Sequence, residues 1–126
     1  MFFILNFFDS FTIHIKIALA PINKSLEIDW AAGLSFANEM KMFCDTLKID
    51  YDKVVEYATY DERLGKSHWA VPGPDGELGF GGHCLPKDLS ALIHIAMQLN
   101  TETNVLNAVE ETNDVVRQNR DWEDMK

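Results

Sequence analysis

The chain has 126 residues, of which 47% are hydrophobic and 25% charged, and it carries a formal net charge of -9 at pH 7. This length suits one domain with one core, and the composition is that of a folded soluble protein rather than a disordered one. The acidic balance disfavours nucleic acid as a partner, because the field of the protein would repel a phosphate backbone.

Residues 1–24 are rich in Phe and Ile but do not form a membrane-spanning pattern. Polar residues interrupt the apolar run long before ~18 consecutive apolar positions are reached, and no basic region precedes it. Alternating apolar and polar residues from Phe11 to Ile17 favour a short strand. We therefore expect an N-terminal lead-in, no membrane partner and a cytoplasmic location.

From residue 25 onward the apolar pattern has the period of helices. Two apolar stripes run along the first predicted helix, and we expect it to bury more than one face. One stripe consists of Phe36, Met40, Phe43 and Leu47, and the neighbouring one of Trp30, Ala37 and Cys44. Asp50 is predicted to cap a short helix that runs through about Tyr60 with Val54 and Val55 inward.

The stretch from Asp61 to Cys84 has no helical period and contains the segment PGPDGELGFGG, which holds five of the seven glycines. A loop of this length in a small domain is usually functional or disordered. A helix is predicted to resume at Pro86, a favoured first-turn residue, and Thr101 is predicted to cap a last helix. The inward residues are expected to be Leu89, Leu92, Ile93 and Ala96 in the first of these helices, and Val105, Leu106, Val109 and Val116 in the second. The predicted fold is mainly α, bundle-like, with one long glycine-rich loop.

Cys84 is the strongest candidate for a reactive residue in this sequence. Glycines permit positive φ and a close backbone approach to a ligand, and here they lead directly into His83 and Cys84. A helix that starts at Pro86 places the thiol just before its N-terminus, where unpaired N–H groups and the helix dipole favour an anion. We therefore expect a nucleophilic thiolate, with Lys87 adding positive charge. Asp88 is either a favourable acid in the first helical turn or a group that orients or deprotonates water beside the thiol.

Other interpretations of this segment remain open. Cys84 is alternatively part of a flexible surface turn, and a Cys–His hydrolase would need a base that only the fold can bring close. Cys44, in its helical apolar pattern, is expected to be a small buried hydrophobe, so the two cysteines do not predict a disulfide framework. We expect no metal site, because the candidate ligands lack paired spacing such as C-x-x-C. These candidates are His68, His83, Cys84 and His94.

The string GFGGHCLPKDLSALI, from Gly79 to Ile93, resembles the active-site cysteine motif of the UDP-glucose/GDP-mannose dehydrogenase family. The glycine pair, the cysteine and the Pro-Lys-Asp that follows stand in the family's order and spacing. Two more segments agree: SFANEM at 35–40 is similar to the family's long central helix, and DERLG at 61–65 to its arginine-bearing turn. The resemblance covers roughly Ala31 to the C-terminus. It makes residues 25–126 a central helical domain for dimerisation and catalysis, preceded by the poorly matching lead-in 1–24.

The resemblance implies a nucleotide-sugar 6-dehydrogenase that uses NAD to oxidise the C6 alcohol of a UDP-glucose-like substrate to a carboxylate. Cys84 would form the thiohemiacetal and thioester intermediates, Asp88 would help to activate water, and Lys87 would supply charge and contact the cofactor. Arg63 would reach the nucleotide sugar in the neighbouring subunit of a homodimer. The sugar would be wrapped by Gly79, Phe80, Gly81 and Gly82.

The resemblance also has departures. The family places a lysine, and four residues later an asparagine, at the start of the central helix, where counting back from Asn38 gives Asn23 and Glu27. No G-x-G-x-x-G motif marks either Rossmann-like domain of the family. We therefore expect the chain alone to be inactive and to need a separate Rossmann-domain partner that binds most of the NAD. The alternatives are a non-catalytic helical dimerisation or interaction module and, more weakly, a thiol redox protein that uses Cys84.

Overall fold

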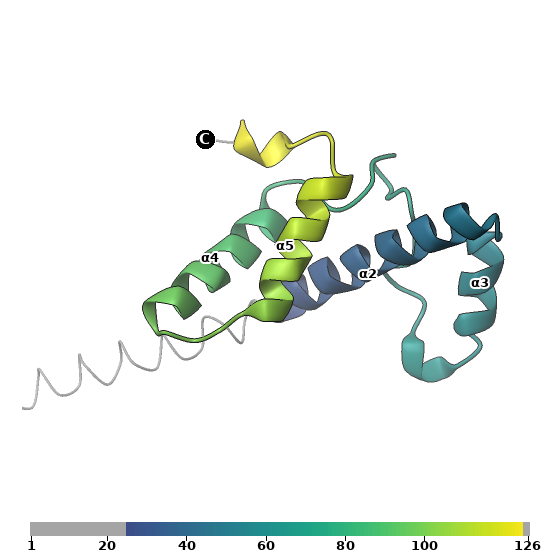
Figure 1. Cartoon of the computed structure of the whole chain (residues 1–126), viewed down its shortest axis with the longest axis horizontal. Helices are drawn as coiled ribbons and strands as arrows, with labels where there is room; N and C mark the ends of the chain where they lie inside the picture. Colours follow the sequence, from purple (N-terminus) through teal and green to yellow (C-terminus); the bar gives the residue numbers. More distant parts are fainter. Residues whose placement is uncertain (1–24, 125–126) are drawn as a thin grey trace, which may run out of the picture.

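The computed structural model describes residues 25–124, which fold into four α-helices and two short 3-10 helices (Figure 1). The helices are α2 (Ser25–Leu47), α3 (Tyr51–Ala58), α4 (Cys84–Gln98) and α5 (Asn104–Val116), and the 3-10 helices are η1 (Glu62–Leu64) and η2 (Asp121–Glu123). This part of the chain has no strand, so the predicted mainly helical fold is confirmed. The strand predicted between Phe11 and Ile17 lies outside the described residues. Among the helices of residues 25–124, none is long and apolar enough to cross a bilayer.

The long helix α2 is the element on which the other three pack. Helices α4 and α5 lie against each other and against α2, whereas α3 turns back beside the C-terminal end of α2 (Figure 1). Two apolar clusters result along α2. The first joins Ala31, Phe80, Leu89, Ile93 and Val109, and the second joins Ala37, Cys44, Tyr51 and Val71.

The face that α2 buries is the one with small side chains. Ala31 and Ala37 are completely buried, whereas Phe36, Phe43 and Leu47 are 52%, 63% and 63% exposed. The prediction that the large apolar stripe lies inward is therefore wrong for these three residues in the single chain, although Met40 of that stripe packs partly buried against the second cluster. In the neighbouring stripe Ala37 and Cys44 are buried as expected, whereas Trp30 is 50% exposed. Alanine side chains let a second element approach closely. Ala31 packs in the cluster with residues of α4 and α5, and Ala37 in the cluster with Tyr51 of α3 and Val71 of the loop.

One of the predicted helix ends is confirmed by the structure, and three others differ from it. The Asp50 carboxylate accepts hydrogen bonds from the backbone N–H groups of Asp52 and Lys53 at 3.0 and 3.3 Å, so the predicted cap of α3 is confirmed. That helix ends at Ala58, two residues early. The cap position of α5 is Thr103 rather than Thr101. The start of α4 also differs, and is described with the site.

Two valines that were expected inward are exposed. Val54 in α3 and Val105 in α5 are 40% and 71% exposed. In α5 the inward face instead runs through the partly buried Leu106 and through Val109, Asn113 and Val116. Val105 precedes Leu106 by one residue and is therefore turned about 100° away from that face.

Candidate active site

Helix α4 begins at Cys84 itself, two residues earlier than predicted. Pro86 is tolerated at the third helical position because the N–H groups of a first turn have no partner inside the helix in any case. The thiol is exposed and belongs to the first turn, rather than preceding it. The cap residue His83 makes no side-chain hydrogen bond at this end. The N–H groups of the first turn lie beside the thiol, at an end of the helix that favours an anion.

Three of the predicted site residues share one face of α4. Cys84, Lys87 and Asp88 stand at i, i+3 and i+4, positions that neighbour each other on a helix. Lys87 is exposed, whereas Asp88 is only 7% exposed. A thiol, an ammonium group and a largely desolvated carboxylate are thus brought together within one turn.

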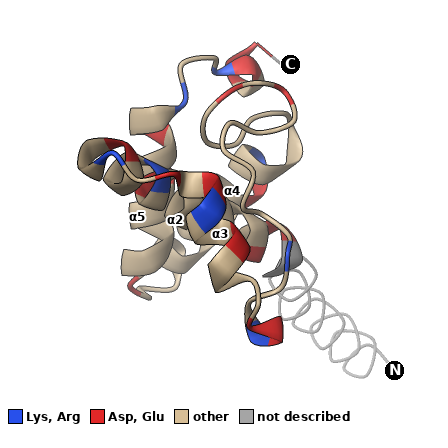
Figure 2. Cartoon of the chain, turned by 90° about the vertical axis from the view of Figure 1, so that its right-hand side faces the viewer, with Lys and Arg blue, Asp and Glu red and all other residues tan. Residues whose placement is uncertain are grey.

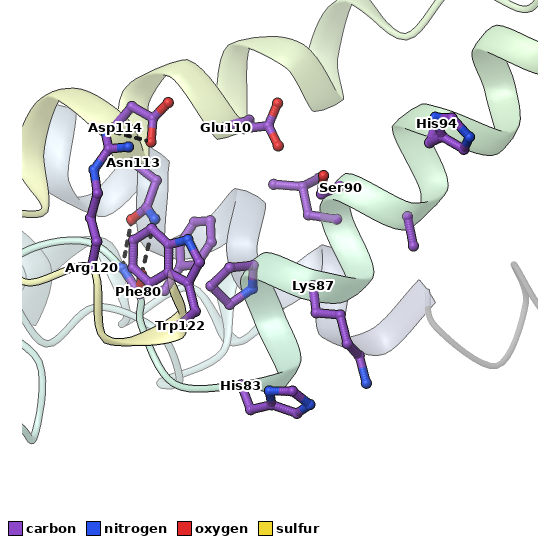
Figure 3. A pocket seen from close by; sticks show the side chains of 13 residues that line it. Phe80, His83, Lys87, Ser90, His94, Glu110, Asn113, Asp114, Arg120 and Trp122 are labelled. Atoms are coloured by element: carbon purple, nitrogen blue, oxygen red, sulfur yellow. Dashed lines mark hydrogen bonds and ion pairs between the residues drawn. The ribbon is translucent and has the colours of Figure 1, made fainter. Parts of the chain in front are cut away.

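A cavity of about 770 Å³ opens beside this turn, between α4, α5 and the segment that follows α5 (Figure 3). Its volume is in the range of small-molecule pockets. His83 and Lys87 line it from the thiol side, and Trp122 and Arg120 from the opposite segment. Asp114 pairs with Arg120 at 3.0 Å. The remaining lining residues are Phe80, Pro86, Leu89, Ser90, Ala91, His94, Glu110 and Asn113.

The glycine-rich loop that leads to Cys84 is held by two buried amide side chains. Asn113 of α5 accepts a hydrogen bond from the Phe80 N–H at 2.7 Å and donates one to the Phe80 carbonyl at 2.9 Å. Asn38 of α2 accepts a hydrogen bond from the Gly79 N–H at 3.1 Å, and its side-chain nitrogen donates a hydrogen bond to the Leu34 carbonyl at 2.8 Å. Both asparagines are nearly inaccessible, at 3% and 2% exposed. The loop is therefore paired to helices on both sides, as a strand would be paired to its neighbours.

A buried guanidinium holds the two ends of the same loop. The Arg117 side chain is 2% exposed and donates to Asp75 at 2.8 Å and to the Asn119 carbonyl at 2.8 Å. It also lies 3.6 Å from Asp121, whose carboxylate accepts the Gly82 N–H at 3.1 Å. The hydrogen bond from Arg117 holds the pKa of Asp75 below its usual range. Burial of the arginine is thus offset by two carboxylates that remain partly in water.

The glycines of this loop serve different purposes. A Cβ atom on Gly79 would lie 2.3 Å from Asn113 Oδ1, and one on Gly81 would lie 2.2 Å from an Arg117 nitrogen. Gly82 has φ +76° and nothing within 4 Å of such an atom. Gly79 and Gly81 therefore leave room for the side chains of Asn113 and Arg117. Of the glycines at 79, 81 and 82, only Gly82 borders open space.

Two residues predicted to bind the substrate have other surroundings in the single chain. The Phe80 side chain is 3% exposed and belongs to the first apolar cluster, although it also borders the cavity. Arg63 is exposed on η1, where its Nε lies 2.9 Å from Asp61. Figure 1 places η1 beyond the end of α3, away from the N-terminus of α4, and Figure 2 shows its acidic and basic positions next to each other. The structure thus brings Lys87 and Asp88 to Cys84 but does not bring Arg63 there.

Sequence reasoning missed Asn113, Arg117 and Asp121 as parts of the site. The available signal was an asparagine within the apolar stripe of α5, between Val109 and Val116. A polar residue on a buried face needs a partner. Among residues 25–124, no three His, Cys, Asp or Glu side chains are grouped so that they could hold a metal ion.

Comparison with known proteins shows which family the sequence matches. Residues 14–115 match the central domain of the UDP-glucose/GDP-mannose dehydrogenase family. The Bacillus subtilis protein YtcA is 42% identical over 84 residues, and the UDP-glucose 6-dehydrogenase TuaD of the same organism is 33% identical over 87, which cover 67% and 69% of this chain. The GDP-mannose 6-dehydrogenase of Pseudomonas aeruginosa is 34% identical over 84 residues, or 66% of this chain. In each case the match spans 18% of the relative's length.

A helical domain with an exposed cysteine at a helix N-terminus, approached by an anchored glycine-rich loop, is thus the central domain of a dehydrogenase family. The chain belongs to the UDP-glucose/GDP-mannose dehydrogenase family.

Proposed function

We propose that this chain supplies the thiol-bearing central domain of an NAD-dependent nucleotide-sugar 6-dehydrogenase that acts on a UDP-glucose-like substrate. The observation that supports this most directly is the position of Cys84. It is exposed in the first turn of α4, with Lys87 and Asp88 on the same face. The exposed sulfur is open to a substrate carbonyl, and the thiolate is the nucleophilic form of a cysteine.

The thiolate of Cys84 attacks the carbonyl carbon of the C6 aldehyde, which forms a C–S bond, and the oxygen takes up a proton to give a thiohemiacetal. Loss of a hydride and a proton converts the thiohemiacetal into a thioester. Water then adds to the thioester carbonyl, the C–S bond breaks, and the carboxylate leaves as the thiol is restored. Asp88 holds the attacking water and accepts its proton, because a desolvated carboxylate near the thiol is suited to a general base.

Two oxidation steps require a hydride acceptor, and NAD supplies this chemistry when it is bound. Lys87 is suited to contact it, since its ammonium group is exposed, one turn from Cys84, at the cavity wall. Residues 25–124 contain no strand and so no βαβ dinucleotide-binding unit of their own. Most of the NAD site therefore belongs to a Rossmann-like domain outside these residues.

A chimera tests this function. Residues 31–124 replace the matching segment of TuaD, and NADH formation from UDP-glucose and NAD is followed by absorbance. We expect turnover that Cys84→Ala abolishes and that Cys44→Ala leaves within about threefold, because Cys44 is part of the core. A folded but inactive chimera, or equal activity of both variants, would contradict the proposal. The 126-residue chain by itself should form no NADH, because a thiol alone does not position a nicotinamide against C6.

We also propose that the chain forms a homodimer through α2. Phe36, Phe43 and Leu47 are more than half exposed on this helix, and burying them against a second copy would remove a large apolar area from water. The dimer would allow Arg63 to reach the site of the neighbouring subunit. Light scattering should give twice the chain mass, and Phe43→Glu should give the single mass.

Met97→Glu is the matched control for this test, because Met97 is 67% exposed on α4 rather than on α2. It should leave the dimer intact. A monomeric wild-type chain at high concentration would refute the dimer. A dimer together with an inactive chimera would favour the non-catalytic dimerisation module.

A further inference from the structure

We infer that Asn113 is a positioning residue for Cys84. This inference rests on the proposed function, in which Cys84 is the reacting group. Asn113 lies on α5, 29 positions from Cys84 in the sequence, and acts on it through the backbone of the glycine-rich loop. Figure 3 shows its amide directed at Phe80, with both hydrogen bonds drawn.

The side-chain amide of Asn113 matches the backbone of Phe80 group for group. Its oxygen accepts the Phe80 N–H and its nitrogen donates to the Phe80 carbonyl. Both groups of Phe80 are buried, so neither finds water if the asparagine is removed. An aspartate could replace only the first of these bonds, and an alanine neither.

Only three residues separate the residue that Asn113 holds from the thiol. Gly81, Gly82 and His83 connect Phe80 to Cys84, and the Gly82 N–H is bound by Asp121 on the way. The Phe80 ring is also fixed in the apolar cluster next to Leu89 of α4. The hydrogen bonds at Phe80 and Gly82 therefore fix the direction in which the chain enters α4. The position of Cys84 in the first turn depends on that direction.

Removal of the Asn113 amide should release the loop while the helices persist. The buried contacts between α2, α4 and α5 do not pass through this side chain, because Leu89, Ile93 and Val109 form them directly. A released loop lets the first turn of α4 fray, so the thiol no longer keeps its fixed position beside the N–H groups of that turn. Cys44 in the second cluster should not respond.

The test compares Asn113→Asp and Asn113→Ala with Asn107→Asp and Asn107→Ala, the same changes at an exposed position of α5. Two quantities are measured on the full 126-residue chain: hydrogen exchange of the Phe80 amide by NMR, and iodoacetamide labelling of each cysteine by mass spectrometry. Exchange at Phe80 should accelerate about tenfold or more in Asn113→Ala, the factor that corresponds to about 1.4 kcal/mol, and less in Asn113→Asp. Labelling of Cys84 should slow about twofold to fivefold, with Cys44 unchanged.

Three results would overturn the inference. The first is faster exchange at Phe80 without any change at Cys84, which would mean that the loop does not position the thiol. The second is a parallel acceleration at Cys44, which would indicate a general loosening. The third is loss of the helical circular dichroism in both Asn113 variants, which would mean that Asn113 maintains the fold. None of these readouts uses NAD or a nucleotide sugar, so an inactive chimera would refute the dehydrogenase role and leave this inference intact.

Discussion

The contact between Gly79 and Asn113 can be tested by adding a single methyl group. Both Gly79 and Gly76 have positive φ, +67° and +80°, so alanine at either position carries the cost of a left-handed backbone. That cost is about 1–2 kcal/mol. At Gly76 nothing lies within 4 Å of the new Cβ, whereas at Gly79 the Asn113 oxygen is 2.3 Å away and a Val116 methyl 3.1 Å away.

The methyl group on Gly79 must therefore displace the Asn113 amide. This leaves the N–H and the carbonyl of Phe80 buried without partners, at roughly 1–3 kcal/mol for each group. We expect Gly76→Ala to lower the free energy of unfolding by about 1–2 kcal/mol, and Gly79→Ala by about 3–8 kcal/mol.

Urea unfolding followed by tryptophan fluorescence measures both values, and the difference between them removes the shared backbone cost. A Gly82→Ala variant provides a second control, because Gly82 has φ +76° and open space around it. If all three variants lost the same stability, the close approach of Asn113 to the loop would contribute nothing and the reasoning would be refuted.

Three further predictions concern the cysteines, Tyr51 and the core. Iodoacetamide should label Cys84 about tenfold faster than Cys44 at neutral pH, because Cys84 is exposed and Cys44 is 8% exposed; equal rates by peptide mass spectrometry would contradict this. Burial raises the pKa of Tyr51 to about 12, so its contribution to stability is complete below about pH 10 and is lost as the pH rises toward 12. Tyrosinate absorbance should therefore contain a late step that Tyr51→Phe removes, and a titration unchanged by that substitution would refute the assignment. Leu89→Ala should cost about 2–5 kcal/mol of unfolding free energy, since Leu89 is 1% exposed, and Leu99→Ala at 65% exposed should cost less than about 0.5 kcal/mol; similar losses would show that the first cluster is not the core.

Local patterns predicted the helices of this domain because their signals lie close together in the sequence. The carboxylate of Asp50 and the spacing of Leu89 and Ile93 are read within a few residues, and both interpretations hold in the structure. The start of α4 was placed two residues late because proline marks a first turn without fixing which position in it. Cys84 is accordingly part of the helix that was expected to follow it.

The inward face of α2 and the anchors of the loop depended on contacts that no local pattern contains. Phe36 and Ala37 are neighbours in the sequence, and Ala37 is the buried one because it packs in the cluster with Tyr51 of α3 and Val71 of the loop. The bonds from Asn38 to Gly79 and from Asn113 to Phe80 span 41 and 33 residues. The motif around Cys84 therefore identified the chemistry, but the residues that fix its geometry became visible only in three dimensions.

The fit of Gly79 against Asn113, and of Gly81 against Arg117, constrains how this domain can change in evolution. A larger residue at position 81 needs Arg117 to move or shorten, and one at position 79 needs Asn113 to shorten and still carries the backbone cost of φ +67°. A shortened partner gives up its hydrogen bonds to the loop. Neither order of substitution has a neutral intermediate, so each pair should be inherited as a unit. The loss of stability on substituting one residue of a pair then measures how strongly the two residues are coupled.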